Sequence, residues 1–121
     1  MRASALILVL GIALGAFGAH ALKNLISNPD TYRTGSLYHL IHGVALFGLS
    51  LSRIKFTPQI KWAIWLFVFG IILFSGSLYL LAMKELFENP VILKVLGPLT
   101  PIGGISFISG WILILLSRFE D

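Results

Sequence analysis

Charged residues occur in clusters along the chain, and long, mostly apolar segments separate the clusters. Four segments contain no Asp, Glu, Lys or Arg, and each is 19 to 23 residues long: residues 3–22, 34–52, 62–83 and 95–117. A helix needs about 20 apolar residues to cross a ~30 Å hydrocarbon core. None of these segments alternates apolar and polar residues as membrane strands do. The pattern therefore predicts an all-α protein, a four-transmembrane-helix bundle.

Proline pairs at the segment boundaries predict where three of the helices begin. Asn or Thr caps the free N–H groups of a helix start, and Pro suits the first helical position. Such pairs occupy residues 28–29, 57–58 and 100–101. We predict helices over roughly residues 3–22, 29–52, 58–83 and 101–118, in a single domain that covers residues 1–121. The last helix would be short, so residues 91–96 are expected to form a short interfacial segment before it.

The composition agrees with an integral membrane protein and excludes several other classes. Hydrophobic residues make up 57% of the chain and charged residues 12%, with a mean hydropathy of +0.93. A soluble domain is about a quarter charged, and disorder requires low hydrophobicity. The net charge of +4 is spread thinly among apolar segments and forms no basic patch, so nucleic acid is not an expected partner. The absence of Cys excludes disulfides and thiolate chemistry. The expected surroundings are the lipid bilayer.

The distribution of Lys and Arg predicts the orientation of the helices. The short connection between the second and third helices contains Arg53, Lys55 and Lys61 and no acidic residue. Cytoplasmic loops of membrane proteins are enriched in Lys and Arg. Four crossings place both termini on the same side as this connection. We therefore predict a multi-pass protein of the cell membrane with both termini in the cytoplasm.

Small residues on the predicted helices indicate where helices approach each other closely. Lipid provides no hydrophobic force between helices, so contacts between small residues carry much of the association. The predicted packing residues are Gly11, Gly15, Gly18, Gly43, Gly76, Gly103 and Gly110. On the first helix His20 lies opposite the glycines, so both faces of this helix are expected to be buried. Either the first helix is central, or one of its faces meets another protein chain.

Polar side chains gather in the half of the bundle that would lie near the outer membrane surface. The predicted polar pocket consists of His20, Ser36, Tyr38, His39, His42, Ser75, Tyr79 and Thr100. Ionisable residues inside a membrane are functional candidates by default. This outer cluster is therefore the main candidate for a functional site.

The histidines allow two interpretations of this cluster. His39 and His42 are three residues apart on one helix, and His20 ends a neighbouring helix, so the three are candidate ligands for zinc, copper or haem iron. No Cys or carboxylate completes a ligand set. The favoured interpretation is that each imidazole is hydrogen-bonded within the bundle, with no metal site and no cofactor. No catalytic motif is present, neither a Ser-His-Asp grouping nor a phosphate loop nor HExxH, so we do not expect an enzyme.

Several short motifs together resemble a known family. They are GAFGAH at residues 15–20, Tyr38-His39 with His42, FSGSLY at residues 74–79, and TPIGG at residues 100–104 followed by Gly110-Trp111. In this order they resemble the domain of unknown function 423 family, the family of transmembrane protein 256. The resemblance covers essentially the whole chain and implies a four-helix multi-pass membrane protein. It implies no activity, because the family has no agreed one.

Two functions are compatible with these features. The first is a structural or accessory membrane component, as a homo-oligomer or as a subunit of a larger membrane complex. The alternative is a protein that binds or transports a small ligand, a lipid, a metal or haem through the outer His and Tyr residues.

Overall fold

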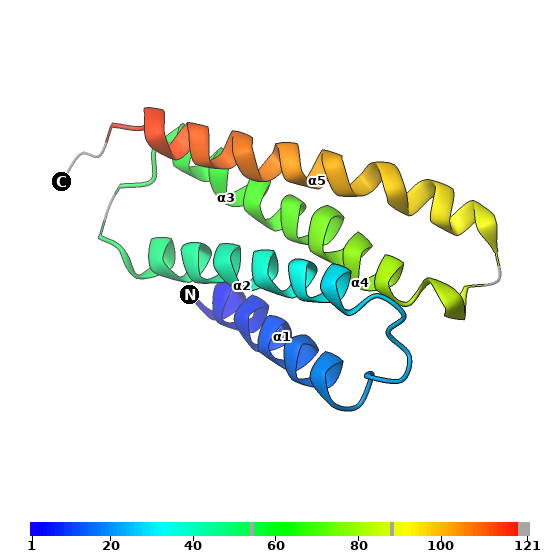
Figure 1. The fold of residues 1–121 in the computed structure, drawn as a ribbon. Helices are drawn as coiled ribbons and strands as arrows, with labels where there is room; N and C mark the ends of the chain where they lie inside the picture. The colour runs from blue at the N-terminus through cyan, green and yellow to red at the C-terminus, as the bar shows by residue number, and fades with distance from the viewer. Residues whose placement is uncertain (54, 88, 119–121) are drawn as a thin grey trace.

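Helices make up most of the chain in the computed structural model, which describes residues 1–53, 55–87 and 89–118. They are α1 (Arg2–Ala19), α2 (Pro29–Leu51), α3 (Pro58–Gly70), the π-helical turn η1 (Ile71–Ser75), α4 (Gly76–Ala82), the 3₁₀ turn η2 (Lys84–Leu86) and α5 (Pro90–Leu116). The segments α3, η1 and α4 follow one another without a break and form one long helix (Figure 1). The described residues contain no strand, so the all-α class is confirmed.

Three of the four long helices are long and apolar enough to cross a membrane: Arg2–Ala19, Pro58–Ala82 and Pro90–Leu116. The other long helix, α2, has 23 residues and is less apolar. Its first half contains Asp30 and Arg33, and its middle contains His39 and His42. Length and hydropathy alone therefore support three membrane spans.

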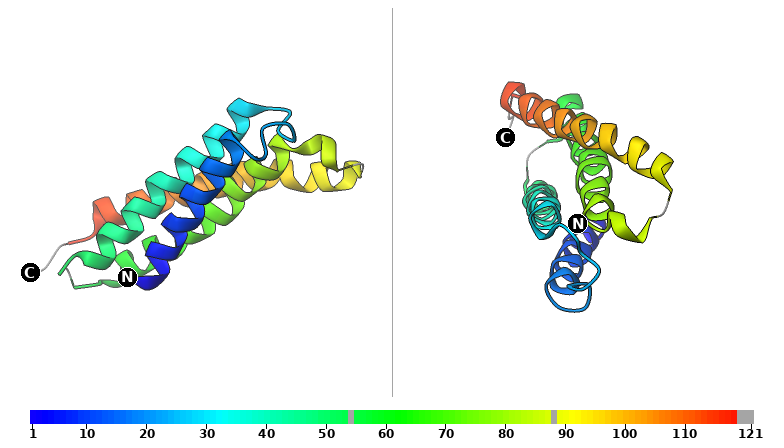
Figure 2. Two further views of the ribbon diagram at one scale, coloured as in Figure 1. Left: turned by 90° about the horizontal axis from the view of Figure 1, so that it is seen from below. Right: turned by 45° about the vertical axis from the view of Figure 1, so that its right-hand side comes forward.

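The helices form two neighbouring pairs, α1 with α2 and α3 with α5. The continuous helix α3–η1–α4 packs against both α2 and α5. Helix α1 packs mainly against α2, at the edge of the bundle and away from α5 (Figure 2). A central position for the first helix is therefore wrong, and α1 exposes Leu6, Val9 and Ile12 by 59–62%. The start of α1, the end of α2, the start of α3 and the end of α5 lie at one end of the bundle (Figure 1).

The expected capping pairs begin two of the helices. The Asn28 side chain accepts a hydrogen bond from the backbone N–H of Thr31 at 3.2 Å at the start of α2. The Thr57 side chain accepts one from the N–H of Ile60 at the start of α3. A proline is the first helical residue in both cases. These starts follow from local sequence, because each cap bonds only three residues ahead.

The last helix differs from the prediction, because α5 begins at Pro90 and not at Pro101. Asn89 caps this start, and the helix continues through Pro98 and Pro101. Residues 91–96 are thus its first turns and not a separate interfacial segment. Each internal proline leaves the carbonyl four residues earlier without a helical partner. These carbonyls belong to Lys94 and Gly97, and both residues are exposed, so solvent or lipid headgroups can reach this part of the helix.

A buried apolar cluster joins α2, α3, η1 and α5. It consists of Leu46, Phe67, Ile71 and Phe107, each 8% exposed or less. The π-helical turn contains about one residue more than an α-helical turn. The residues after it therefore point in directions that are rotated about the axis of the long helix. This rotation was not predicted.

Glycines permit close contact at most of the predicted positions. A Cβ atom at Gly103 would collide with the backbone N of Phe74 and lie 2.8 Å from its Cα, and one at Gly110 would lie 2.7 Å from the Phe67 ring. Gly76 differs, because its nearest neighbour would be 3.9 Å away, so it is no close-packing position. Two glycines outside the predicted set, Gly35 and Gly70, also make close contacts.

Candidate functional site

His39 joins three helices through both nitrogens of its ring. It belongs to α2, is 5% exposed, and bonds to residues of α1 and α4. Its Nε2 lies 3.1 Å from the carbonyl oxygen of Ile7, and its Nδ1 lies 3.2 Å from the hydroxyl of Tyr79. A carbonyl can only accept, so Nε2 carries the proton and Nδ1 accepts from the Tyr79 hydroxyl. Both groups are satisfied when the imidazole is neutral.

His42 makes a second junction, between α2 and α5. Its Nδ1 lies 2.7 Å from the carbonyl oxygen of Tyr38, and the indole N–H of Trp111 donates to its Nε2 at 3.1 Å. An indole N–H can only donate, so His42 is neutral with its proton on Nδ1. The ring also stacks on Phe107, with centroids 3.5 Å apart and planes within 8° of parallel. The two histidines therefore have opposite tautomers, each fixed by its partners.

The glycines of α1 expose backbone carbonyl groups to α2. Within a helix the carbonyl of one residue lies beside the residue four positions later. Gly11 follows Ile7 by four, and a Cβ there would lie 3.1 Å from the His39 ring. Gly18 follows Leu14 by four, and the Tyr32 hydroxyl donates to the Leu14 carbonyl at 2.7 Å. A side chain at Gly18 would collide with the Tyr32 ring, and one at Gly11 would make a tight contact with the His39 ring.

The same arrangement occurs where α3 meets α5. The Ser106 hydroxyl donates to the carbonyl of Leu66 at 2.7 Å, and Gly70 lies four residues after Leu66. A Cβ at Gly70 would collide with the ring of Phe107, which follows Ser106. A glycine thus lies beside each of three carbonyls that accept a side-chain hydrogen bond from another helix.

The predicted polar cluster is divided among separate places in the structure. His39 and Tyr79 lie together, whereas His42 faces the other side of α2 and contacts α5. Tyr38 is 39% exposed and packs its ring 4.7 Å from that of Phe74. His39 and His42 are three residues apart, so their side chains point in directions about 60° apart around the helix axis. This difference is enough for each histidine to face a different helix.

His20 lies apart from the other two histidines. It is exposed at the C-terminal cap of α1. Within the part of the chain that the structure describes, no side-chain hydrogen bond joins it to the other predicted pocket residues. The structure therefore does not bring the three imidazoles together.

The remaining predicted residues, Ser36, Ser75 and Thr100, belong to α2, η1 and α5. The hydroxyls of Ser77 and Thr100 lie 2.6 Å apart and connect α4 to α5. Ser75 is fully buried in the π-helical turn, and its hydroxyl has no hydrogen-bond partner within the described residues. The Ser36 hydroxyl lies beside Gly15, 3.1 Å from where a Cβ there would be.

The arrangement favours cohesion over ligand binding. Metal ligation by imidazole uses a nitrogen lone pair, and the lone pairs of both buried histidines already accept hydrogen bonds from Tyr79 and Trp111. No group of three or more His, Cys, Asp or Glu within residues 1–53, 55–87 and 89–118 has the geometry of a metal site. Binding a metal at His39 or His42 would require a helix–helix hydrogen bond to break.

Trp111 bonds to a residue of the predicted polar pocket but was not among the residues predicted for it. A tryptophan in a membrane helix is usually taken as an interfacial anchor. Here its N–H bonds to His42, and its ring lies 4.9 Å from that of Phe67. Trp111 is 44% exposed, so it is only partly buried against the bundle.

Comparison with known proteins agrees with the motif resemblance. The family model described as a protein of unknown function, DUF423, matches residues 14–104. The UPF0382 membrane protein YwdK of Bacillus subtilis is 39% identical over 118 residues, covering 93% of this chain and 89% of its own. UPF0382 membrane proteins of Staphylococcus aureus (strain bovine RF122) and Staphylococcus saprophyticus are 38% and 34% identical over 114 residues, covering 93% of this chain and 88% and 89% of their own. No solved structure matches the chain significantly. The chain therefore belongs to the DUF423 family of membrane proteins.

Proposed function

We propose that this protein is a structural or accessory membrane component without catalytic activity, and that it works by assembling with a second copy or with a larger membrane complex. The observation that carries the proposal is that both ring nitrogens of His39 and the Nε2 of His42 are bonded to other helices, while the Nδ1 of His42 is bonded within α2. Groups that would bind substrate, metal or haem are instead occupied in holding the bundle together.

The proposal includes a membrane crossing by α2. Its polar residues His39 and His42 are buried against neighbouring helices, which removes them from lipid. Its outward face presents Leu37, Ile41 and Val44, which are 46–61% exposed. A helix can cross a membrane with this arrangement because its polar groups face the bundle interior. We propose that all four long helices cross the cell membrane and that both termini, with the connection containing Arg53 and Lys55 and with Lys61 in the first turn of α3, face the cytoplasm.

Substitution of the histidines tests the role assigned to the core. His39→Gln and His42→Gln each retain a donor and an acceptor, and a hydrogen bond between membrane helices contributes about 0.6 kcal/mol on average. Both variants should therefore purify with the helix content and particle mass of the unmodified protein. The comparison is made by circular dichroism and light scattering in detergent.

The alternative function gives a different result in the same samples. A metal or haem protein would carry a stoichiometric metal by elemental analysis or a visible absorbance band. His39→Gln would remove that signal while the helix content stayed intact. This outcome would replace the structural role with ligand binding.

Photo-crosslinking in intact membranes tests the proposed assembly. Val9 of α1 and Ile108 of α5 are 60% and 62% exposed, and the helices that carry them, α1 and α5, lie on opposite sides of the bundle (Figure 2). A photoreactive amino acid at an assembly surface should give one discrete product, with the mass of a dimer or of a defined second protein. Irradiated unmodified protein is the control. Crosslinking to lipid alone from both positions would contradict assembly through these faces.

A further inference from the structure

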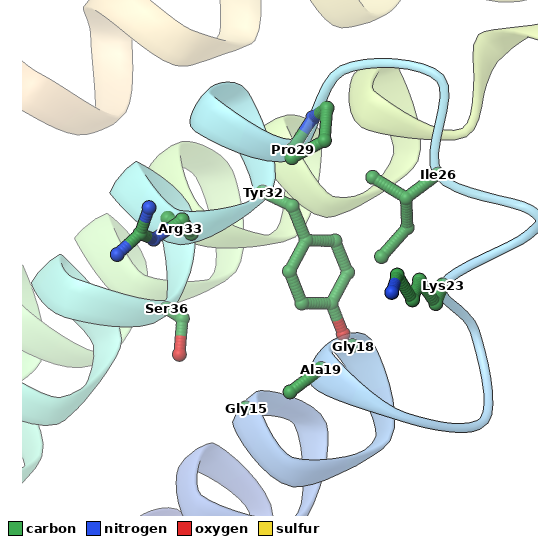
Figure 3. A pocket seen from close by; sticks show the side chains of 9 residues that line it. All are labelled: Gly15, Gly18, Ala19, Lys23, Ile26, Pro29, Tyr32, Arg33 and Ser36. Atoms are coloured by element: carbon green, nitrogen blue, oxygen red, sulfur yellow. The ribbon is translucent and has the colours of Figure 1, made fainter.

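A cavity of about 460 Å³ lies where the end of α1, the start of α2 and the loop between them meet (Figure 3). It is lined by Gly15, Gly18, Ala19, Lys23, Ile26, Pro29, Tyr32, Arg33 and Ser36. Small-ligand sites in proteins typically have volumes of roughly 300–1,000 Å³. This cavity is distinct from the hydrogen-bonded surroundings of His39 and His42.

Hydrogen bonds to two helices fix the walls of the cavity. The Tyr32 ring fits over Gly18, and its hydroxyl bonds to the α1 carbonyl of Leu14. The backbone N–H and the hydroxyl of Ser27 both donate to the carbonyl of Ala82 at the end of α4, at 2.9 and 3.0 Å. The loop that carries Lys23 and Ile26 is therefore attached to the bundle at both of its ends.

The lining combines positive charge with an apolar floor. Lys23 on the loop and Arg33 on α2 lie on either side of the Tyr32 ring (Figure 3). The lining residues include no Asp or Glu, so no carboxylate neutralises the two cations within the cavity. The floor is formed by Gly15, Gly18 and Ala19, which contribute no polar side chain. Such a site favours a ligand with an anionic head and an apolar body.

The position of the cavity identifies the kind of ligand. It lies at the end of α1, a helix that is long and apolar enough to span a membrane. Lys23 and Arg33 are therefore near the level of lipid headgroups. Gly15 lies about one helical turn deeper than Ala19, the last residue of α1. We propose that this cavity binds the phosphate headgroup of an anionic membrane phospholipid, with the start of its acyl chain against the glycine and alanine floor.

Lipid binding to the purified protein tests the proposal. The protein in detergent micelles is titrated with phosphatidylglycerol or with phosphatidylcholine of the same acyl chains, and bound lipid is counted by native mass spectrometry. Each Lys or Arg near an anionic lipid contributes to the free energy of binding. The loss of two such residues together is expected to change the affinity about thirtyfold. We expect Lys23→Gln with Arg33→Gln to weaken phosphatidylglycerol binding by about thirtyfold and to leave phosphatidylcholine binding unchanged.

Two further variants separate a built site from general charge attraction. Lys84→Gln with Lys94→Gln removes two exposed cations that do not line the cavity, and it should leave phosphatidylglycerol affinity within about twofold. Ala19→Phe fills the floor from an exposed position and should lower the binding of both lipids. Helix content and particle mass are measured for each variant.

Three results would overturn the proposal. The first is equal affinity of the unmodified protein for the two lipids. The second is an equal loss of affinity in the two double-charge variants, which would indicate nonspecific attraction. The third is displacement of phosphatidylglycerol by inorganic phosphate at the same concentration, which would indicate a site for free anions and not for a lipid.

Discussion

Gly103 lies where α5 packs against the backbone of the π-helical turn, and one added methyl group there is expected to force the two helices apart. A Cβ atom at this position would lie 2.8 Å from both Cα and Cβ of Phe74 and would collide with the backbone N. An ordinary contact needs about 3.4 Å or more, so the helices must separate by roughly half an ångström or more. The obstacle is backbone, which cannot move aside as a side-chain rotamer can.

The energetic cost can be isolated with a matched glycine. Overpacking a well-packed interior costs about 1–3 kcal/mol, while Gly→Ala in a helix gains up to about 1 kcal/mol from propensity alone. A methyl group added at Gly48 in α2 would meet no atom within 4 Å. The free energy of unfolding of Gly48→Ala therefore changes only through helix propensity. The free energy of unfolding of Gly103→Ala should therefore be about 1–3 kcal/mol below that of Gly48→Ala.

Unfolding in mixed micelles measures this difference. The protein in a mild detergent is titrated with sodium dodecyl sulfate, and the near-ultraviolet circular dichroism of the aromatic side chains reports the loss of packing, such as that of Trp111 against Phe67. The midpoint for Gly103→Ala should occur at a lower dodecyl sulfate fraction than that for Gly48→Ala. Equal stability of the two variants, within about 0.5 kcal/mol, would refute the close contact between α5 and η1.

Four other substitutions, one of them a control, test polar contacts, with stability measured in the same titration. Ser75→Ala should leave stability unchanged or raise it by about 1 kcal/mol, since the removed hydroxyl is buried without a partner among the described residues. Ser106→Ala, which removes a bonded hydroxyl, is the control and should lower stability. Trp111→Phe should cost about 0.6–1.7 kcal/mol, because it removes the donor to His42 and retains an aromatic ring. A loss well below this range would contradict that bond. Tyr32→Phe should cost a similar amount, because its hydroxyl bonds to an α1 carbonyl. No change in Tyr32→Phe would mean that the ring alone holds α1 against α2.

The sequence alone indicated where the helices lie and that they belong in a membrane. Charges are expensive in hydrocarbon, so the uncharged segments mark the apolar helices directly. The caps at Asn28 and Thr57 act over three residues and are equally visible in the sequence. The start of α5 was predicted wrongly because Thr100-Pro101 has the same local pattern as a true start. Only the continuation of helix from Pro90 shows that these two residues are internal.

The polar core could be predicted in its residue types but not in its pairing. The sequence showed His39 and His42 on one helix and a glycine stripe on another. It could not show that Gly11 exposes the Ile7 carbonyl to His39, or that Trp111 reaches His42.

Only the tertiary structure decided these pairings, the edge position of α1 and the cationic cavity beside Tyr32. Local sequence fixes the conformation of each helix because its hydrogen bonds span four residues. The rotation and neighbours of each helix depend on contacts between residues far apart in the chain. His39 and Tyr79 are 40 positions apart in the chain, and His42 and Trp111 are 69 positions apart, so these partners meet only when the helices pack.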